Sequence, residues 1–296
     1  MATVAGVVSA PSLGDATTVH SETTNTSSKG TNSLRNSNRT AAGPKASRAE
    51  KPTIGSIVPY FGAARLIAAE VGKVLKGLRW VGIPFCGSMP EVFCIDAPTV
   101  VVNDRYHLVI NLARMLGHPV LGPQLYRRLK RTLFHPESLA AAQAVCRNSA
   151  SSLSDLDLAY NYFVSQWMGR SAKAGTKNEL TGALPVRWTG NGGDSNTRYR
   201  SAVSSIVSWR RLMAACNFTC MDAFDFLAKC KDDKTVGIYV DPPWPDAGDE
   251  YKYRFTPAEH DRLAAILTAY TKSRVVYRFY GDHPLVAKLY PKREWV

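Results

Sequence analysis

The sequence lacks several features that define large classes of protein. It has no apolar run of the roughly 18 residues that a membrane-spanning helix needs. Its first residues show no basic segment followed by an apolar stretch and a cleavage site. No Cys-x-x-Cys pair with nearby histidines is present to complete a zinc site. We therefore expect a cytoplasmic protein that is neither inserted in a membrane nor secreted, and that binds no metal.

The six cysteines stand apart from one another, in apolar or helical surroundings. This pattern favours free, buried thiols in a reducing compartment over disulfides or metal ligands. The residues are Cys86, Cys94, Cys146, Cys216, Cys220 and Cys230.

Acidic residues are scarce compared with basic ones. The 296 residues include 24 Asp and Glu against 37 Lys and Arg, which gives a net charge of +13. Residues 121–215 hold 13 basic and 5 acidic residues, so eight of the excess charges lie in this one segment. Such a concentration suits a polyanionic partner whose phosphates it neutralises. A solvated basic surface explains the charge equally well at this point.

Composition divides the chain into four parts. Residues 1–52 are rich in Ser, Thr, Asn and Gly without apolar periodicity, which predicts a disordered tail, an organelle transit peptide being the alternative. Residues 53–119 and 216–296 carry alternating strand and helix patterns. Residues 120–215 read as helices around 125–133, 138–145, 153–168 and 202–214, with a long polar loop at 169–198.

The strand patterns are short apolar runs at 79–85, 99–102, 218–221, 236–240 and 274–279. Helical patterns separate them, one of which begins with the cap signature Thr256, Pro257 and Glu259. Strands that alternate with helices predict an α/β protein with a doubly wound, mostly parallel sheet, interrupted by one mainly helical insertion.

Acidic residues and small residues follow four of the predicted strands. Asp104, Asp222 and Asp241 each come after a strand, and the turn 84–88 (Pro-Phe-Cys-Gly-Ser) follows another. Because ligands of such sheets bind at the carboxyl ends of the strands, these groups are expected to meet in one site. The turn differs from the G-x-G-x-x-G of dinucleotide enzymes, and Asp104 is placed to accept hydrogen bonds from ribose hydroxyls.

The most specific motif follows the strand at 236–240. It is the DPPW segment, which consists of Asp241, Pro242, Pro243 and Trp244. Two prolines stiffen the turn and leave carbonyls beside a carboxylate and an aromatic face. An exocyclic amine on a flat ring can donate one N–H to Asp241 and one to the Pro242 carbonyl while the ring stacks on Trp244.

These motifs and their order resemble the D12 class of N6-adenine DNA methyltransferases, the family of the Dam and phage-type enzymes, over residues 57–290. The segment 60–65 resembles the family's N-terminal element, and 84–88 its donor-binding turn. Asp104 resembles its ribose-binding acid, 222–224 its Asp-x-Phe segment, and the DPPW segment its catalytic tetrapeptide. As in this class, the donor turn precedes the helical insertion and the tetrapeptide follows it.

The resemblance implies a Rossmann-like class I methyltransferase fold whose helical insertion recognises DNA. It implies S-adenosyl-L-methionine as cofactor, double-stranded DNA as partner and a monomer, and it leaves open a restriction endonuclease as a second partner. The implied catalytic residues are those of the DPPW segment. The implied donor-binding residues are Tyr60, Phe61, Gly62, Pro84, Phe85, Gly87, Asp104, Asp222, Ala223, Phe224 and Asp241.

Basic and polar side chains of the insertion are the candidates for DNA contacts. We expect phosphate contacts from one basic run and base contacts from the long loop and its end. The first group is Arg127, Arg128, Lys130 and Arg131, and the second is Arg187, Trp188, Asn191, Arg198 and Arg200.

The chain departs from the family pattern at two positions of interest. Ala64 stands where the family usually has a lysine, and Arg278 where small polar residues are common. Two other functions stay open: methylation of RNA adenine or of another planar amine or amide, and DNA binding without catalysis.

Overall fold

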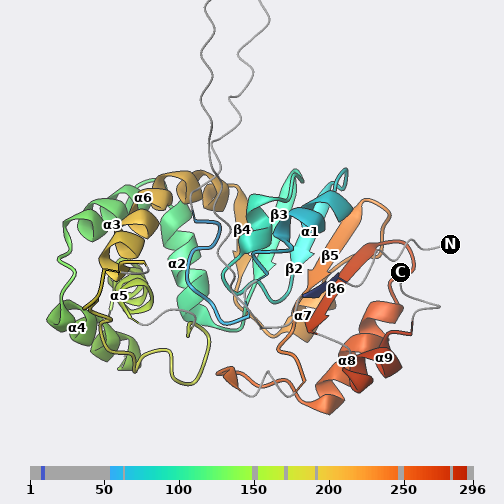
Figure 1. Cartoon of the computed structure of the whole chain (residues 1–296). Coiled ribbons are helices and arrows are strands. Elements are labelled where there is room, and N and C mark those ends of the chain that lie inside the picture. Colours follow the sequence, from blue (N-terminus) through green and yellow to red (C-terminus); the bar gives the residue numbers. More distant parts are fainter. Residues whose placement is uncertain are drawn as a thin grey trace, which may run out of the picture.

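Five parallel strands form the centre of the protein, for which we use a computed structural model (Figure 1). The structure describes residues 8–10, 54–62, 64–148, 153–169, 173–190, 193–245, 250–280 and 283–291. In spatial order the strands are β6 (Arg274–Tyr280), β5 (Val236–Val240), β2 (Trp80–Ile83), β3 (Thr99–Asn103) and β4 (Cys216–Thr219). The short strand β1 (Val8–Ala10) pairs with β6 at one edge, also in parallel.

The strands are apolar because both faces of the sheet are covered. All five residues of β5 are buried, as expected for a central strand of a parallel sheet. Successive side chains of a strand point to opposite faces. Ile238 and Val240 accordingly join one hydrophobic core, while Tyr239 joins the other.

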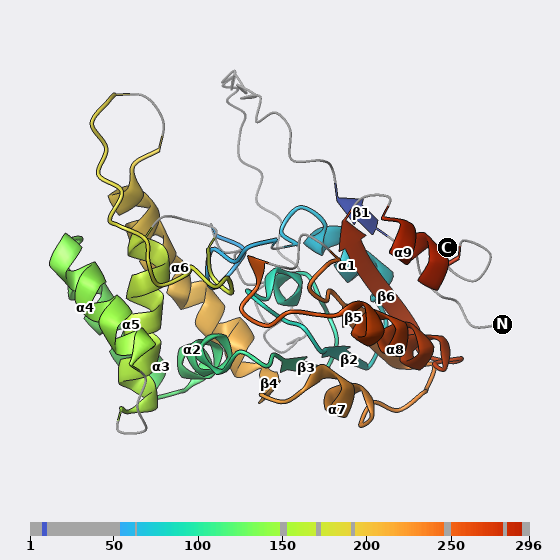
Figure 2. The same ribbon diagram turned by 90° about the horizontal axis from the view of Figure 1, so that it is seen from below.

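Each core is closed by helices. Helix α1 (Ala68–Val74) packs its Val71 on the core that contains Val81 and Tyr239. Helices α7 (Ala223–Leu227), α8 (Pro257–Thr268) and α9 (Pro284–Leu289) cover the core with Ile238. Figure 2 shows α1 and α7 on opposite sides of the sheet. The chain therefore has an α/β Rossmann-like fold, as the alternation of strands and helices predicts.

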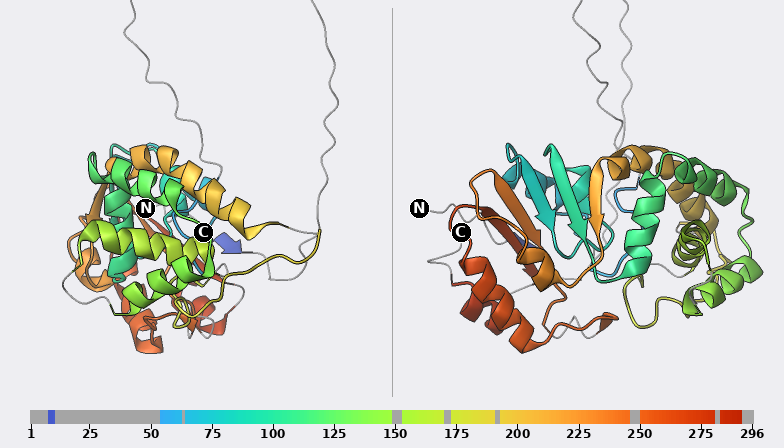
Figure 3. Two further views of the ribbon diagram at one scale, coloured as in Figure 1. Left: turned by 90° about the vertical axis from the view of Figure 1, so that its left-hand side faces the viewer. Right: turned by 180° about the vertical axis from the view of Figure 1, so that it is seen from behind.

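A group of helices lies beside the β4 edge of the sheet (Figure 3). It consists of α2 (His107–Gly117), α3 (Leu121–Arg131), α4 (Pro136–Arg147), α5 (Asp155–Met168) and α6 (Ser195–Ala214). The rings of Trp167 and Trp209 stack at its centre, 6.2 Å apart. Their indole N–H groups donate to the carbonyls of Ile57 and Ile54, at 2.9 and 2.8 Å. The segment that leads to the N-terminal element is thus fastened to α5 and α6.

Several predicted boundaries differ from the observed ones, and two of these differences have a clear local cause. Helix α6 begins at Ser195, seven residues before the predicted helix, because Asp194 caps it by accepting from the Thr197 amide. Strand β4 ends at Thr219 and not at residue 221, so Asp222 lies beyond the strand and caps α7. The predicted capping box at Thr256 and Glu259 is confirmed.

The expectations for the N-terminal tail, for membrane spans and for the cysteines can be compared with the described residues only in part. Val8–Ala10 lie in the predicted tail and form β1, and the rest of that tail, residues 1–7 and 11–52, lies outside the described residues. Among the described helices, none is long and apolar enough to span a membrane. All six cysteines are free, but of the predicted buried thiols only Cys86 and Cys146 are fully buried, and Cys220 is exposed.

Candidate functional site

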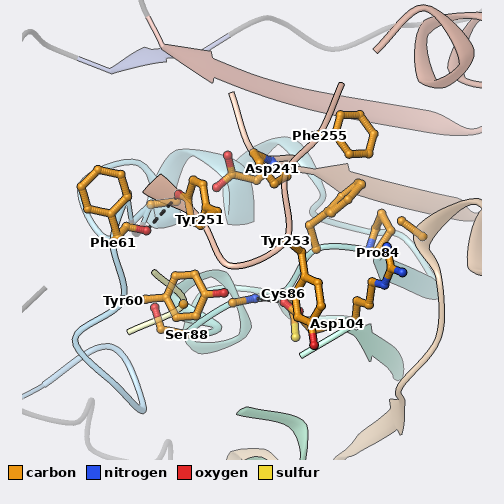
Figure 4. A pocket seen from close by; sticks show the side chains of 18 of the residues that line it. Tyr60, Phe61, Pro84, Cys86, Ser88, Asp104, Asp241, Tyr251, Tyr253 and Phe255 are labelled. Atoms are coloured by element: carbon orange, nitrogen blue, oxygen red, sulfur yellow. Dashed lines mark hydrogen bonds between the residues drawn. The ribbon is translucent and has the colours of Figure 1, made fainter. Parts of the chain in front are cut away.

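A pocket opens at the carboxyl ends of four strands, where the sequence predicts a site. Its empty space, mouth included, is about 900 Å³. Segments that follow β2, β3, β4 and β5 line it, together with residues 60–62, Gly175 and the stretch 251–255. Figure 4 shows Asp241 and Asp104 in this pocket, with aromatic side chains around them. Every predicted donor-binding residue lines the pocket except Phe224.

The turn after β2 is built so that its backbone faces the pocket. Gly87 has a φ of +43°, a conformation that side chains rarely adopt, and an added Cβ would lie 3.4 Å from the ring of Tyr60. The Gly87 amide donates to Asp104 Oδ2 at 2.9 Å. The Asp104 carboxylate also accepts from the Tyr106 amide, which begins α2. Burial raises the pKa of Asp104 to about 6.

Asn103 joins three strand ends that the sequence could not connect. Its side-chain N–H groups donate to the carbonyls of Pro84 and Met221, both at 3.0 Å. Its Oδ1 accepts from the Thr219 hydroxyl and the Met221 amide. Because Asn103 is fully buried, this amide fixes the spacing of the ends of β2, β3 and β4. Asp104, one residue on, is thereby held at the pocket.

The predicted Asp-x-Phe segment lies at the β4 side of the pocket. Asp222 and Ala223 line the pocket, and the Asp222 carboxylate caps α7 by accepting from the Phe224 amide. Phe224 itself is buried and stacks on Phe255, with ring centres 5.8 Å apart. It therefore supports the pocket wall from behind.

The N-terminal element closes the opposite side. Gly62 has a φ of +68°, and an added Cβ would lie 2.5 Å from the Tyr251 hydroxyl. That hydroxyl donates to the carbonyl of Phe61 at 3.0 Å. The Phe61 amide donates to the carbonyl of Ala174, from the loop between α5 and α6. Ala63, in the same predicted motif, lies outside the described residues.

The carboxylate of the DPPW segment is held by three donors. Asp241 Oδ2 accepts from Arg278 Nη1 at 2.6 Å and from the Tyr239 hydroxyl at 3.5 Å, and Oδ1 accepts from Trp244 Nε1 at 3.2 Å. A carboxylate offers about four lone-pair positions, so one remains for a further N–H. Burial raises the pKa of Asp241, and the Arg278 guanidinium opposes that rise.

The rest of the DPPW segment lies around this carboxylate. Pro243 lines the pocket, whereas Pro242 is buried and Trp244 is not among the lining residues. The guanidinium carbon of Arg278 lies 4.6 Å from the centre of the Trp244 ring, so a cation covers one face of the predicted stacking surface. Arg278 also donates to the carbonyl of Gly62 at 2.8 Å. Whether Trp244 stacks on a base stays a prediction.

Several residues that line the pocket were not predicted, among them an aromatic group and a buried carboxyl. Tyr251, Tyr253 and Phe255 come after the DPPW segment and cover the pocket, and Phe255 packs edge-on against Phe85 with centres 5.6 Å apart. In the sequence these aromatic residues alternate with Lys252 and Arg254, and that alternation could have identified them. Glu91 lines the pocket at 2% exposure, and nothing in the sequence around it indicates a site.

The basic run predicted to contact phosphates lies on α3. Its four side chains, of Arg127, Arg128, Lys130 and Arg131, are all exposed. Arg128 differs from the others, because it pairs with Asp157 at 2.5 Å and covers the ring of Tyr160 at 3.7 Å. The described structure therefore offers three exposed cations on α3 besides one that already has an acidic partner.

The predicted base-reading residues are scattered. Arg198 donates to the carbonyl of Gly169 at 3.0 Å, and Arg200 to that of Lys130 at 3.1 Å, so both fasten parts of the helical group. Arg187 donates to the carbonyl of Thr189, and Trp188 is 89% exposed. Asn191 lies outside the described residues.

Comparisons with known proteins add no assignment to this geometry. No family model and no curated protein matches the chain. Within the described residues, no group of three or more His, Cys, Asp or Glu side chains is arranged to hold a metal ion.

Proposed function

We propose that the protein is an S-adenosylmethionine-dependent methyltransferase that methylates N6 of adenine in DNA. The observation that carries the proposal is the meeting, in one pocket, of the turn 84–88, Asp104 and Asp241. The three come from different strand ends, and each was selected from the sequence for a distinct part of this reaction. The donor half and the acceptor half of the site therefore share one cavity.

The pocket suits an adenosyl donor in shape and in polarity. Gly87 and Gly62 both line the pocket with a positive φ, and a Cβ at Gly62 would clash with the Tyr251 hydroxyl, so glycine lets the bare main chain face a ligand at both positions. The Asp104 carboxylate accepts from the backbone N–H groups of Gly87, Tyr106 and Arg105, which leaves one of its four or so lone-pair positions for a ribose hydroxyl. Bound S-adenosylmethionine would supply an electrophilic methyl group on a sulfonium.

Asp241 and the Pro242 carbonyl would act on the acceptor. The N6 lone pair of adenine is delocalised into the ring, so the amine is a poor nucleophile. Hydrogen bonds from its two N–H groups to these two oxygens favour a more pyramidal nitrogen and hold it in line for the transfer. The Pro243 carbonyl is engaged elsewhere, by the side chain of His260.

The base must leave the duplex to reach Asp241, since stacking and pairing hide its amino group. The exposed cations of α3 are suited to hold the phosphates while this happens. This part of the proposal rests on charge and on the resemblance of the motif order.

A DNA-binding protein without catalysis is the second candidate. It is favoured by Arg278, because the guanidinium already takes the two contacts that a target base would make, with Asp241 and with the Trp244 face. Catalysis requires that the remaining acceptor position on Asp241 be used or that Arg278 move.

One assay separates these functions. Purified protein is incubated with methyl-labelled S-adenosylmethionine and either unmethylated genomic DNA or total RNA, and N6-methyladenine is quantified by mass spectrometry. Label in DNA supports the proposal, label in RNA alone replaces it, and DNA binding without label supports the second candidate. Asp241→Ala should abolish the transfer, and Asp96→Ala, an exposed acid, should not.

A further inference from the structure

Glu91 is a buried carboxyl in the pocket to which neither the sequence motifs nor the proposed reaction gives a role. It belongs to the 3-10 helix η1 (Pro90–Phe93), directly after the donor turn. Met89 precedes η1 with a φ of +60°, in the left-handed region that favours glycine, although it is a fully buried methionine. The backbone is thus held in an unfavourable conformation where it delivers Glu91 to the pocket.

Among the described residues, no salt bridge pairs Glu91 with a cation. Arg278, from β6, is the cation that lowers the pKa of Glu91, but that guanidinium is bonded to Asp241 at 2.6 Å. Asp241 adds a like charge, and the Tyr239 hydroxyl, from β5, is shared between Glu91 and Asp241. Helix α1, which packs on η1, carries Glu70 and Lys73, which are exposed and paired with each other.

Burial therefore raises the pKa of Glu91 to about 8, and Asp241 adds to the rise. At neutral pH the carboxyl carries a proton in the ligand-free protein. A cation that entered the pocket would favour the carboxylate and expel that proton.

We propose that Glu91 matches the charge of this site to a sulfonium: it releases its proton to solvent when the cationic donor binds, and it thereby makes the protein prefer S-adenosylmethionine over the neutral thioether S-adenosylhomocysteine. The inference rests on the proposed function and deepens it. The O–H bond of the carboxyl breaks, the proton passes to the buffer, and no redox or group transfer is involved. When the sulfonium has lost its methyl group, the carboxylate regains a proton and the product is held less tightly.

Calorimetry of the full chain with the two ligands tests this. Both ligands carry the same ammonium and carboxylate, so their difference isolates the sulfonium. Titrations at pH 7 in buffers of different ionisation enthalpy should show close to one more proton released with S-adenosylmethionine than with S-adenosylhomocysteine. The affinity ratio of the two ligands should rise with pH up to about pH 8 and then level off.

Glu91→Gln, which keeps the size and the neutral state, should remove the extra proton and reduce the affinity ratio by roughly tenfold above pH 8. The exposed Glu70→Gln is the matched control and should behave as wild type. The proton count in the wild type needs no variant, so a variant that folds poorly does not remove the test.

The outcomes distinguish a wrong assignment of the protein's function from a wrong role for Glu91. If the wild type binds neither ligand, the proposed function is wrong and this inference falls with it. If both ligands bind but release the same number of protons, or if Glu91→Gln leaves the affinity ratio unchanged, Glu91 has no part in recognising charge while the donor site itself stands.

Discussion

The Asp241 carboxylate pairs with one buried guanidinium, that of Arg278. The side chain of Arg278 is 5% exposed and that of Asp241 16%, so water screens their pair only weakly. Their separation of 2.6 Å places the guanidinium where it opposes the rise that burial causes in the pKa of Asp241. Arg278 therefore belongs to the same bonded unit as the DPPW segment.

Arg278→Met should consequently destabilise the protein by leaving Asp241 buried without a countercharge. The loss for a broken buried pair is about 3–5 kcal/mol. Adding Asp241→Asn should recover part of it, because the orphaned charge is removed. Urea unfolding at pH 8 of the wild type, both single variants and the double variant measures this coupling. A double variant no more stable than Arg278→Met would show that the pair does not carry the effect.

Glu91 makes a separate prediction about stability. Its pKa is about 8 in the folded protein against 4.5 for the ordinary group, so the folded state binds more protons between these values. Stability contributed by this group is therefore full below pH 4.5 and is lost as the pH rises towards 8. Relative to wild type, Glu91→Gln should grow more stable over that interval and change little beyond it. Urea midpoints at pH 5, 6.5 and 8 provide the measurement, and a constant difference would contradict it.

At the scale of elements, sequence patterns predict what local chemistry determines. The capping box at Thr256 and the apolar run of β5 were predicted because both signals lie within a few neighbouring residues. The start of α6 was missed because a single capping carboxylate, on Asp194, turns a polar run into a helix. Apolar periodicity gives no signal for a helix that begins with polar residues in this way.

The candidate site likewise contains some residues that local sequence patterns predict and others that they do not. Turns and strand-terminal acids were predicted because parallel strands bring their ends to one edge. The roles of Asn103, Glu91 and Arg278 were not predicted, since each depends on partners from distant parts of the chain. Met221 lies 118 residues from Asn103, and Asp241 37 residues from Arg278. Such pairings follow from tertiary packing and leave no local sequence signal.

For helix α3, the structure indicates which of its cations are available to contact DNA phosphates. If its exposed cations contact phosphates, neutralising Arg127, Lys130 and Arg131 to Gln should lower the slope of log affinity against log salt by roughly 2.7, about 0.9 per contact. Arg128→Gln should lower it less, because Arg128 is already paired with Asp157. Fluorescence anisotropy with a labelled duplex over a range of salt concentrations gives the slopes.

The control for this experiment removes the same charge elsewhere. The exposed Lys229, Lys231 and Lys234 follow α7, and α7 lies well away from α3 in Figure 1. Their triple Gln variant should leave the slope unchanged. Equal effects of the two triple variants would show that only net charge matters, and α3 would then be an ordinary solvated surface.

At the scale of the whole molecule, the candidate pocket and the basic helix α3 are distinct parts of one chain. The pocket lies at the carboxyl ends of the sheet strands, and no residue of α3 lines it. The two are nevertheless connected: the loop between α5 and α6 reaches the pocket at Gly175, Tyr106 fastens this loop by donating to Glu179, and α5 and α6 both pack against α3. Because no residue of α3 lines the pocket, we expect that substitutions can weaken donor binding and DNA binding separately.

Asp104→Asn tests this separation from the donor side. Asparagine keeps one acceptor oxygen for the backbone amides of Gly87 or Tyr106 but loses the charge and the second acceptor that a ribose hydroxyl needs. Affinity for S-adenosylmethionine should fall by roughly tenfold or more, as expected for the loss of a charge-assisted hydrogen bond. Affinity for duplex DNA without donor should stay within a few-fold of wild type. The α3 triple variant should show the reverse, with donor affinity retained and DNA affinity reduced. Calorimetry for the donor and anisotropy for DNA, on the same preparations, measure both; a loss of DNA binding in Asp104→Asn equal to its loss of donor binding would place both ligands at one site and refute the division.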